Sequence, residues 1–122
     1  ADINKGSSLD KAAVEYIGTK IDNATITGAH LAYLTMVASN NRVDSVTLNR
    51  AIDIIFDAST RSDLGVNIKE SAGIAIRQII SILNAEGLSA DEELFTIFVR
   101  TAMEYSSIEE FSVSVIMTLK GL

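Results

Sequence analysis

The sequence contains no cysteine, no proline and no tryptophan, and only one of its 122 residues is a histidine. Without cysteine the chain can form no disulfide, no thiolate nucleophile and no Cys-based zinc or iron–sulfur site. It has no run of about 18 consecutive apolar residues, which a membrane-spanning helix requires. Its start also lacks the charged-then-apolar layout of a signal peptide. We therefore expect a cytoplasmic protein with no cofactor and no membrane partner.

Basic residues are scarce: the chain has 10 Lys and Arg against 16 Asp and Glu, a net charge of −6. Residues 1–83 hold eight basic and nine acidic side chains, whereas residues 84–122 hold two basic and seven acidic ones. No basic run or stripe is available to neutralise phosphates, so we do not expect direct binding of nucleic acid. The acidic last third could instead dock on a basic surface of another protein.

The composition is that of a globular chain, with 48% hydrophobic and 21% charged residues. A length of 122 residues is close to the commonest domain size. We expect a single α-helical domain over 1–122, with 1–6 flexible.

Apolar residues recur at helical spacing along the chain. The longest such stretch, Val66 to Leu83, predicts a central helix at about 67–85 with Ile79 and Ile80 in the middle of its apolar side. The whole pattern predicts a compact all-α bundle of about six helices around that helix. The other helices are expected to begin after Ser7 or Ser8, at Ala29, after Asp44 or Ser45, after Ser89 and after Ser107.

Helix starts and inward-facing residues follow from the same spacing. Asn67 with Glu70, Ser89 with Glu92 and Ser107 with Glu110 have the spacing of a capping box. The core-facing residues are expected to be Leu9, Ala13, Tyr16, Ile17 and Ile21 in the first helix; Leu31, Leu34, Val37 and Ala38 in the second; Leu48, Ala51, Ile52, Ile54, Ile55, Phe56 and Ala58 in the third; and Leu94, Phe95, Phe98, Val99, Ala102 and Met103 in the fifth.

Two ambiguities stay open. Apolar residues in 111–119 also alternate with a period of two, which is typical of a strand, although a lone strand would be unpaired. Segments 50–58 and 77–85 have similar sequences, and the similar composition of two buried helices explains this more simply than a repeat does.

No pattern of catalytic residues is present. His30 is the only histidine and no nucleophile motif frames it, so we interpret it as a structural residue and expect a non-enzymatic protein. Asp53 and Asp57 lie one helical turn apart but form no ligand cage, so we expect no metal site.

What the pattern does show is a surplus of apolar surface. Three helices have apolar arcs of about 160°, wider than the ~100° that one core requires. Ile74 and Ile97 lie off the main apolar sides and are the candidate contact residues. The sequence therefore favours a protein–protein interaction module, with a homo-oligomeric assembly or scaffold component as the first interpretation. The alternative is an acidic regulatory or inhibitory protein that binds through Asp91, Glu92, Glu93, Glu109 and Glu110.

Overall fold

The structure, a computed structural model, describes residues 8–39, 43–86 and 92–105. In chain order the elements are α1 (Ser8–Asp22), α2 (Gly28–Ser39), α3 (Ser45–Thr60), the 3-10 helix η2 (Ser62–Leu64), α4 (Val66–Glu86) and α5 (Glu92–Glu104). All of these elements are helical, which confirms the predicted all-α bundle for the described ranges. The predicted sixth helix, and with it the question of helix or strand at 111–119, lies outside them.

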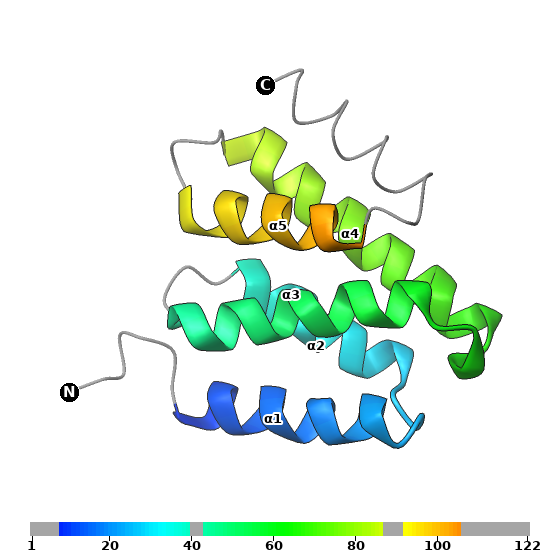
Figure 1. Cartoon of the computed structure of the whole chain (residues 1–122). Helices are drawn as coiled ribbons and strands as arrows, with labels where there is room; N and C mark the ends of the chain where they lie inside the picture. Colours follow the sequence, from blue (N-terminus) through cyan, green and yellow to red (C-terminus); the bar gives the residue numbers. More distant parts are fainter. Residues whose placement is uncertain (1–7, 40–42, 87–91, 106–122) are drawn as a thin grey trace.

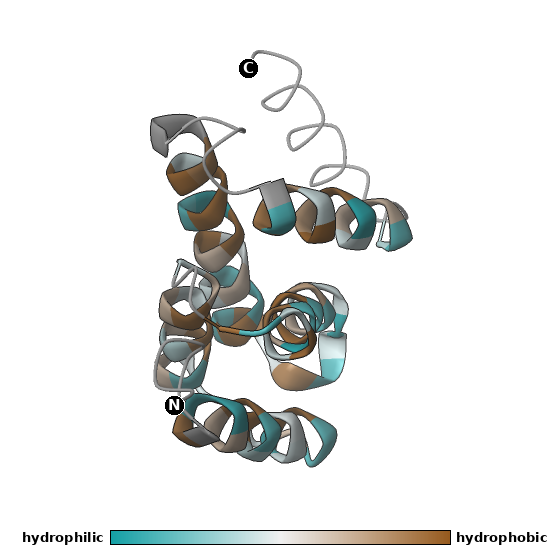
Figure 2. Ribbon diagram, turned by 90° about the vertical axis from the view of Figure 1, so that its left-hand side faces the viewer, coloured by the Kyte–Doolittle hydropathy of each residue, from teal (hydrophilic) through white to brown (hydrophobic). Residues whose placement is uncertain are grey.

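The five α-helices form two layers (Figure 1). α1, α3 and α5 lie side by side in one layer, while α2 and α4 lie side by side in the other. The view in Figure 2, turned by 90°, separates α2 and α4 from α3 and α5. Because the chain crosses from one layer to the other between each α-helix and the next, it forms a stack of helical hairpins.

The centre of this stack is shared between two helices. α4, the helix predicted to be central, is the longest and packs mainly on α2 and α3. α3 packs on α1, α2, α4 and α5, and so has neighbours on more sides. α3 and α4, which contain the similar segments 50–58 and 77–85, lie in different layers; the helices in equivalent places are α1 with α3 and α2 with α4.

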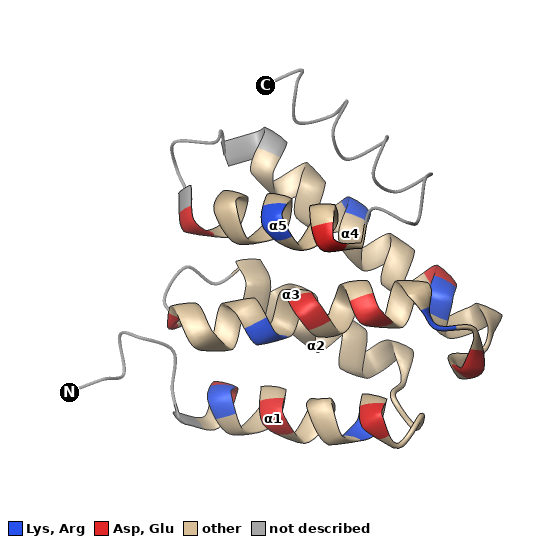
Figure 3. Ribbon diagram, viewed as in Figure 1, with Lys and Arg blue, Asp and Glu red and all other residues tan. Residues whose placement is uncertain are grey.

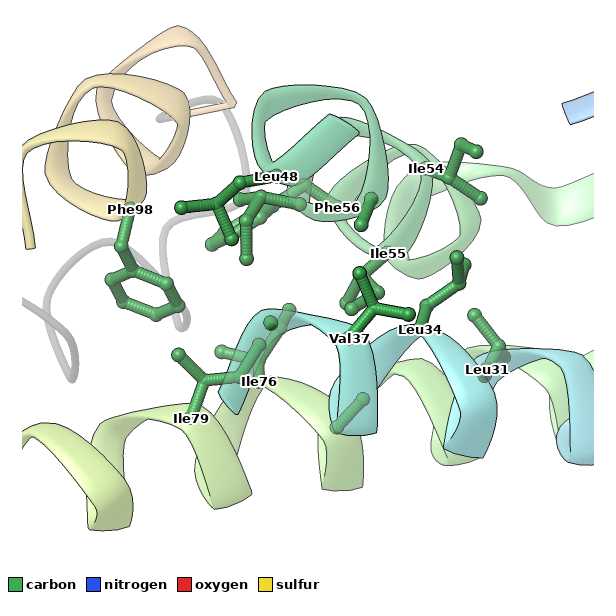
Figure 4. Close-up of a cluster of buried hydrophobic side chains, with 14 of the residues drawn as sticks. Leu31, Leu34, Val37, Leu48, Ile54, Ile55, Phe56, Ile76, Ile79 and Phe98 are labelled. Atoms are coloured by element: carbon green, nitrogen blue, oxygen red, sulfur yellow. The ribbon is translucent and has the colours of Figure 1, made fainter. Parts of the chain in front are cut away.

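The core lies between the layers, and Figure 4 shows the part of it that is built from side chains of α2, α3, α4 and α5. Phe56 of α3 and Phe98 of α5 are its largest fully buried side chains. All the residues predicted to face inward from α2 and α3 are buried, which confirms both helix faces. In α4 the buried residues are Ala72, Gly73, Ala75, Ile76, Ile79, Ile80 and Leu83, while Ile68 and Ile82 are half-buried.

The prediction for α1 was partly wrong. Leu9 and Tyr16 are 77% and 55% exposed, whereas Val14, which was not predicted to face inward, is buried together with Ile17 and Ile21. The reason is that α1 is covered mainly on the side that packs against α3, so that a narrow stripe at positions i, i+3 and i+7 is enough to bury it.

The buried side of α5 differs from the predicted one by a rotation around the helix axis. Met103 is 63% exposed and Phe95 and Val99 are only half-buried, whereas Ile97 is buried with 6% exposed. The apolar side of α5 is broad, and its packing on α3 selects the part centred on Phe98. The expectation that Ile97 lies off the core-facing side was therefore wrong.

Helix starts also divide into correct and incorrect predictions. Asp44 caps α3, because its carboxylate accepts a hydrogen bond from the backbone N–H of Thr47 at 2.7 Å. Asn67 does not cap α4, since that helix begins one residue earlier, after Gly65. Gly65 has φ = 91°, a left-handed conformation that glycine adopts without strain. The proposed caps at Ser89 and Ser107 lie outside the described residues.

We expect Asp44→Ala to lower the free energy of unfolding by about 1 kcal/mol, the usual value of an N-cap. The hydrogen bonds from Thr47 hold the pKa of the Asp44 carboxyl below its ordinary value. A carboxyl with a lowered folded-state pKa stabilises above its unfolded pKa of about 3.9 and loses this contribution as the pH falls through the folded value. Urea unfolding between neutral and acidic pH should therefore show a smaller acid-dependent loss in Asp44→Asn, which keeps a capping oxygen but cannot be protonated in this way. Equal pH profiles would contradict the cap.

Candidate functional site

α2 has no Asp, Glu, Lys or Arg among its 12 residues. Its inner side is buried through Leu31, Leu34, Thr35, Val37 and Ala38. Its outer side exposes Ala29, Ala32 and Met36, which follow one another at i, i+3 and i+7 and therefore form one stripe. Met36 is 55% exposed. A helix that is apolar on all sides is normally covered on all sides. No described residue covers the outer side of α2.

Ile74 of α4 continues this stripe across the gap between the two helices. It is 48% exposed, which agrees with its predicted place off the core-facing side of its helix. A shallow cavity of about 150 Å³ separates it from α2. The residues that line this cavity are Gly28, Ala32, Thr35, Ser71, Ile74, Ala75 and Gln78, none of which is charged. We call Ala29, Ala32, Met36 and Ile74 together the α2 face.

The start of α2 is fixed by a reciprocal pair of hydrogen bonds. The backbone N–H of Thr27 donates to Nδ1 of His30 at 3.0 Å, and the backbone N–H of His30 donates to Oγ1 of Thr27 at 3.3 Å. This is the geometry of a capping box, with histidine in the place usually held by Glu or Gln. The rings of His30 and of Tyr16 in α1 also form an edge-to-face pair, with 6.3 Å between their centroids. His30 thus has the structural contacts expected of it, although the sequence pattern did not reveal the cap.

A second contact holds α2 against α1. The hydroxyl of Tyr33 donates to Oδ1 of Asp10 at 2.7 Å. Burial, together with this hydrogen bond and the carboxylate charge, raises the pKa of Tyr33 to about 12. The phenol therefore stays protonated at neutral pH, so it remains a hydrogen-bond donor and keeps the outer side of α2 in a fixed orientation.

Charged side chains lie on the α-helices other than α2. Figure 3 shows them along α1, α3 and α5, and also on α4. Arg61 contacts Asp57 at 3.7 Å and Asp63 at 2.6 Å, and also donates to the backbone carbonyl of Ile21 at 2.9 Å. Burial raises the pKa of Asp57, although the charge of Arg61 acts in the opposite direction. These contacts tie the end of α3 to α1 and to η2. Arg61, Asp57 and Asp63 therefore have a structural role as ion pairs.

The aromatic end of α5 has a similar structural explanation. Tyr105 donates to Oδ1 of Asp53 at 3.3 Å, and its ring stacks on Phe56 with 5.8 Å between centroids. Burial and the nearby carboxylates raise the pKa of Tyr105. Within the described ranges, no group of three or more His, Asp or Glu side chains is placed to hold a metal ion.

A wider groove runs between α3 and α5, with a volume of about 680 Å³. Its lining residues are Ser45, Val46, Asn49, Glu93, Thr96, Ile97 and Arg100. Arg100 donates to Oδ1 of Asn49 across the groove. The groove is open and mixed in polarity, and its lining contains neither histidine nor a pair of carboxylates, so it offers no acid–base pair for catalysis.

The predicted contact residues are not gathered in one place. Ile97 is in the core, where it presents little surface to a partner. Glu93 is exposed at the start of α5, in the opposite layer from Ile74. Glu92 is the first residue of α5, but its side chain lies outside the described part of the structure. Asp91, Glu109 and Glu110 lie outside it altogether.

Comparison with known proteins adds no assignment: no family model, no curated protein and no solved structure matches this chain. Among the described helices, none combines the length and the apolar character needed to cross a bilayer. Fold alone does not define function, so the functional argument depends on the surfaces described above. The sequence pattern pointed to Ile74 but missed Ala29, Ala32 and Met36, although the lack of charge in α2 could have indicated them.

Proposed function

We propose that this protein is a non-enzymatic protein–protein interaction module that assembles with copies of itself, as a homo-oligomeric assembly or scaffold component. The observation that carries the proposal is the α2 face, a set of exposed apolar side chains that lie on the uncharged helix α2 and, for Ile74, on the neighbouring α4. Exposed apolar side chains gathered in one region of a small protein commonly serve association. A cytoplasmic setting, expected from the sequence, is part of the same proposal.

The structural contacts of the titratable residues support the non-enzymatic part of the proposal. The sole histidine is held in the cap of α2, and the described carboxylates of α3 pair with Arg50, Arg61 and Tyr105. The linings of the two described cavities contain no histidine and no pair of carboxylates. Binding therefore accounts for these surfaces more directly than catalysis does.

The acidic-regulator alternative depends on residues of which only Glu93 has a described side chain. It differs from self-association in its salt dependence. A charge-driven complex with a basic partner weakens steeply as ionic strength rises, whereas an apolar interface between copies does not.

The direct test is the mass of the protein by light scattering at tens of micromolar. We expect a mass above that of the monomer, unchanged between low and high salt. Ile74→Glu should raise the dissociation constant by about tenfold or more, because a carboxylate buried at an apolar interface loses its hydration.

Val46→Glu is the matched control for this change. Val46 is also an exposed β-branched residue, 69% exposed, but it lies on α3 in the other layer. It should leave the mass unchanged, and both variants should keep the helical circular dichroism of the parent. A parent protein that scatters as a monomer at low and high salt would contradict the proposal.

A further inference from the structure

We infer that the partner is a second copy of this chain, and that the two copies meet with α2 antiparallel to α2 across a two-fold axis close to Ala32. The inference rests on the proposed function and specifies the surface and geometry of that association. It follows from the charge of the chain, from the spacing of side chains on the α2 face and from the surroundings of Ile74.

Charge restricts where two copies can approach each other. With a net charge of −6, each copy repels the other over most orientations. α1, α3, α4 and α5 all carry Asp, Glu, Lys or Arg, and α2 is the only described α-helix with none. Contact through α2 therefore keeps the charged side chains of both copies at the edge of the interface, where they remain hydrated.

The order of side chains on α2 selects an antiparallel arrangement. Ala29 and Met36 stand about 10.5 Å apart along the helix axis, with Ala32 between them. In an antiparallel pair the large Met36 of each copy faces the small Ala29 of the other, so both ends of the contact are filled. In a parallel pair two methionines would meet at one end and two alanines would leave a gap at the other. A two-fold axis is compatible with either pairing, but only the antiparallel one sets the large side chain of each copy against the small one of the other.

The small residues also set the approach of the helices. With alanine at two of the three stripe positions, the helix axes can come within about 8 Å, the short end of the normal range. Methionine adapts its shape to an irregular surface. On the α4 side, Ile74 and the uncharged lining of the shallow cavity beside Ala32 extend the contact, and the exposed Glu70 and Arg77 of α4 lie at its edge.

Because the natural chain has no cysteine, single cysteines can map the contact. A disulfide requires Cα atoms about 4.4–6.8 Å apart. We expect Ala32→Cys to cross-link to its own copy under mild oxidation. Ala29→Cys alone and Met36→Cys alone should stay uncross-linked, whereas an equimolar mixture of the two should form the mixed dimer. Val46→Cys, also exposed but on α3, is the control that should not react.

A pair of methionine variants tests the same contact without cross-linking. Met36 and Met103 both lie near the C-terminal ends of their helices and are 55% and 63% exposed, and a lysine is favourable for the helix at such a position. Met36→Lys should raise the dissociation constant of the dimer by about tenfold or more. Met103→Lys on α5 should leave it unchanged.

The outcomes separate this inference from the proposed function. If the protein is a dimer but Ala29→Cys or Met36→Cys cross-links to its own kind, the antiparallel arrangement is wrong. If the protein is a dimer and none of these cysteines reacts, or if Met103→Lys rather than Met36→Lys weakens the dimer, the interface is not the α2 face and the inference fails while self-association stands. If the parent is a monomer by light scattering, both fail.

Discussion

Phe56→Ala is expected to lower the free energy of unfolding by about 3–5 kcal/mol, the largest effect of any single change considered for this protein. Phe56 is 1% exposed. Its ring forms an edge-to-face pair with Phe98, with 5.3 Å between centroids, and stacks on Tyr105. Removing it therefore leaves a cavity and also breaks the aromatic contacts that join α3 to α5. Urea unfolding followed by far-UV circular dichroism at a fixed protein concentration measures the loss.

Val46→Ala is the matched control for Phe56→Ala, since it truncates an apolar side chain of the same helix that is 69% exposed. Its effect should stay within about 0.5 kcal/mol, as is usual for surface changes. A loss below about 1 kcal/mol for Phe56→Ala would mean that the ring is not enclosed between α3 and α5.

Ile79→Ala and Ile80→Ala are expected to cost about 2–5 kcal/mol each, the usual range for truncating a buried isoleucine. Ile79 is fully buried and Ile80 is 8% exposed, both on the side of α4 that packs on α2 and α3. We place Ile80 at the low end of the range, because part of its side chain already touches solvent. The same urea unfolding experiment applies.

Val66→Ala provides the control in α4, because Val66 is 69% exposed at the first residue of the helix. Small losses for both isoleucines, similar to that of Val66→Ala, would contradict the burial of α4 in the core. Small losses for Ile80 alone would only show that the neighbouring residues close the cavity.

The success of the sequence pattern depended on how tightly each helix is enclosed. α3 has neighbours on several sides, so every apolar residue predicted to face inward is buried and the pattern could not be misread. α1 and α5 bury narrower stripes than their apolar residues allow, and the sequence could not show which part would be covered. As a result, Leu9 and Met103 were predicted to be buried but are exposed, whereas Val14 and Ile97 are buried instead.

Capping and layering show a similar division. The cap at Asp44 is a local interaction over three residues, and it was predictable from sequence. The cap of α2 uses a histidine that the usual capping pattern does not include. The arrangement of hairpins in two layers depends on contacts between distant segments. Helical periodicity does not predict which segments make those contacts.

The candidate surface was half predictable. Ile74 stands among Glu70, Arg77, Gln78 and Ser81 on the outer side of α4, so its exposure followed from spacing alone. The exposure of Ala29, Ala32 and Met36 did not, because a helix that is apolar all round gives no indication of which side faces solvent. Only the neighbours of α2 in space decide that.

The stacking of hairpins also bears on how the molecule opens and closes. α1 makes its main contacts with α3 and α2, and α5 makes its main contacts with α3, so the main contacts between α-helices join elements that are at most two apart in the chain. Chains with such local contacts have low contact order and fold quickly. An end helix can also detach at less than the cost of global unfolding. Amide hydrogens in α3 should therefore exchange by complete unfolding, while those of α1 exchange through smaller fluctuations that leave the rest of the stack folded.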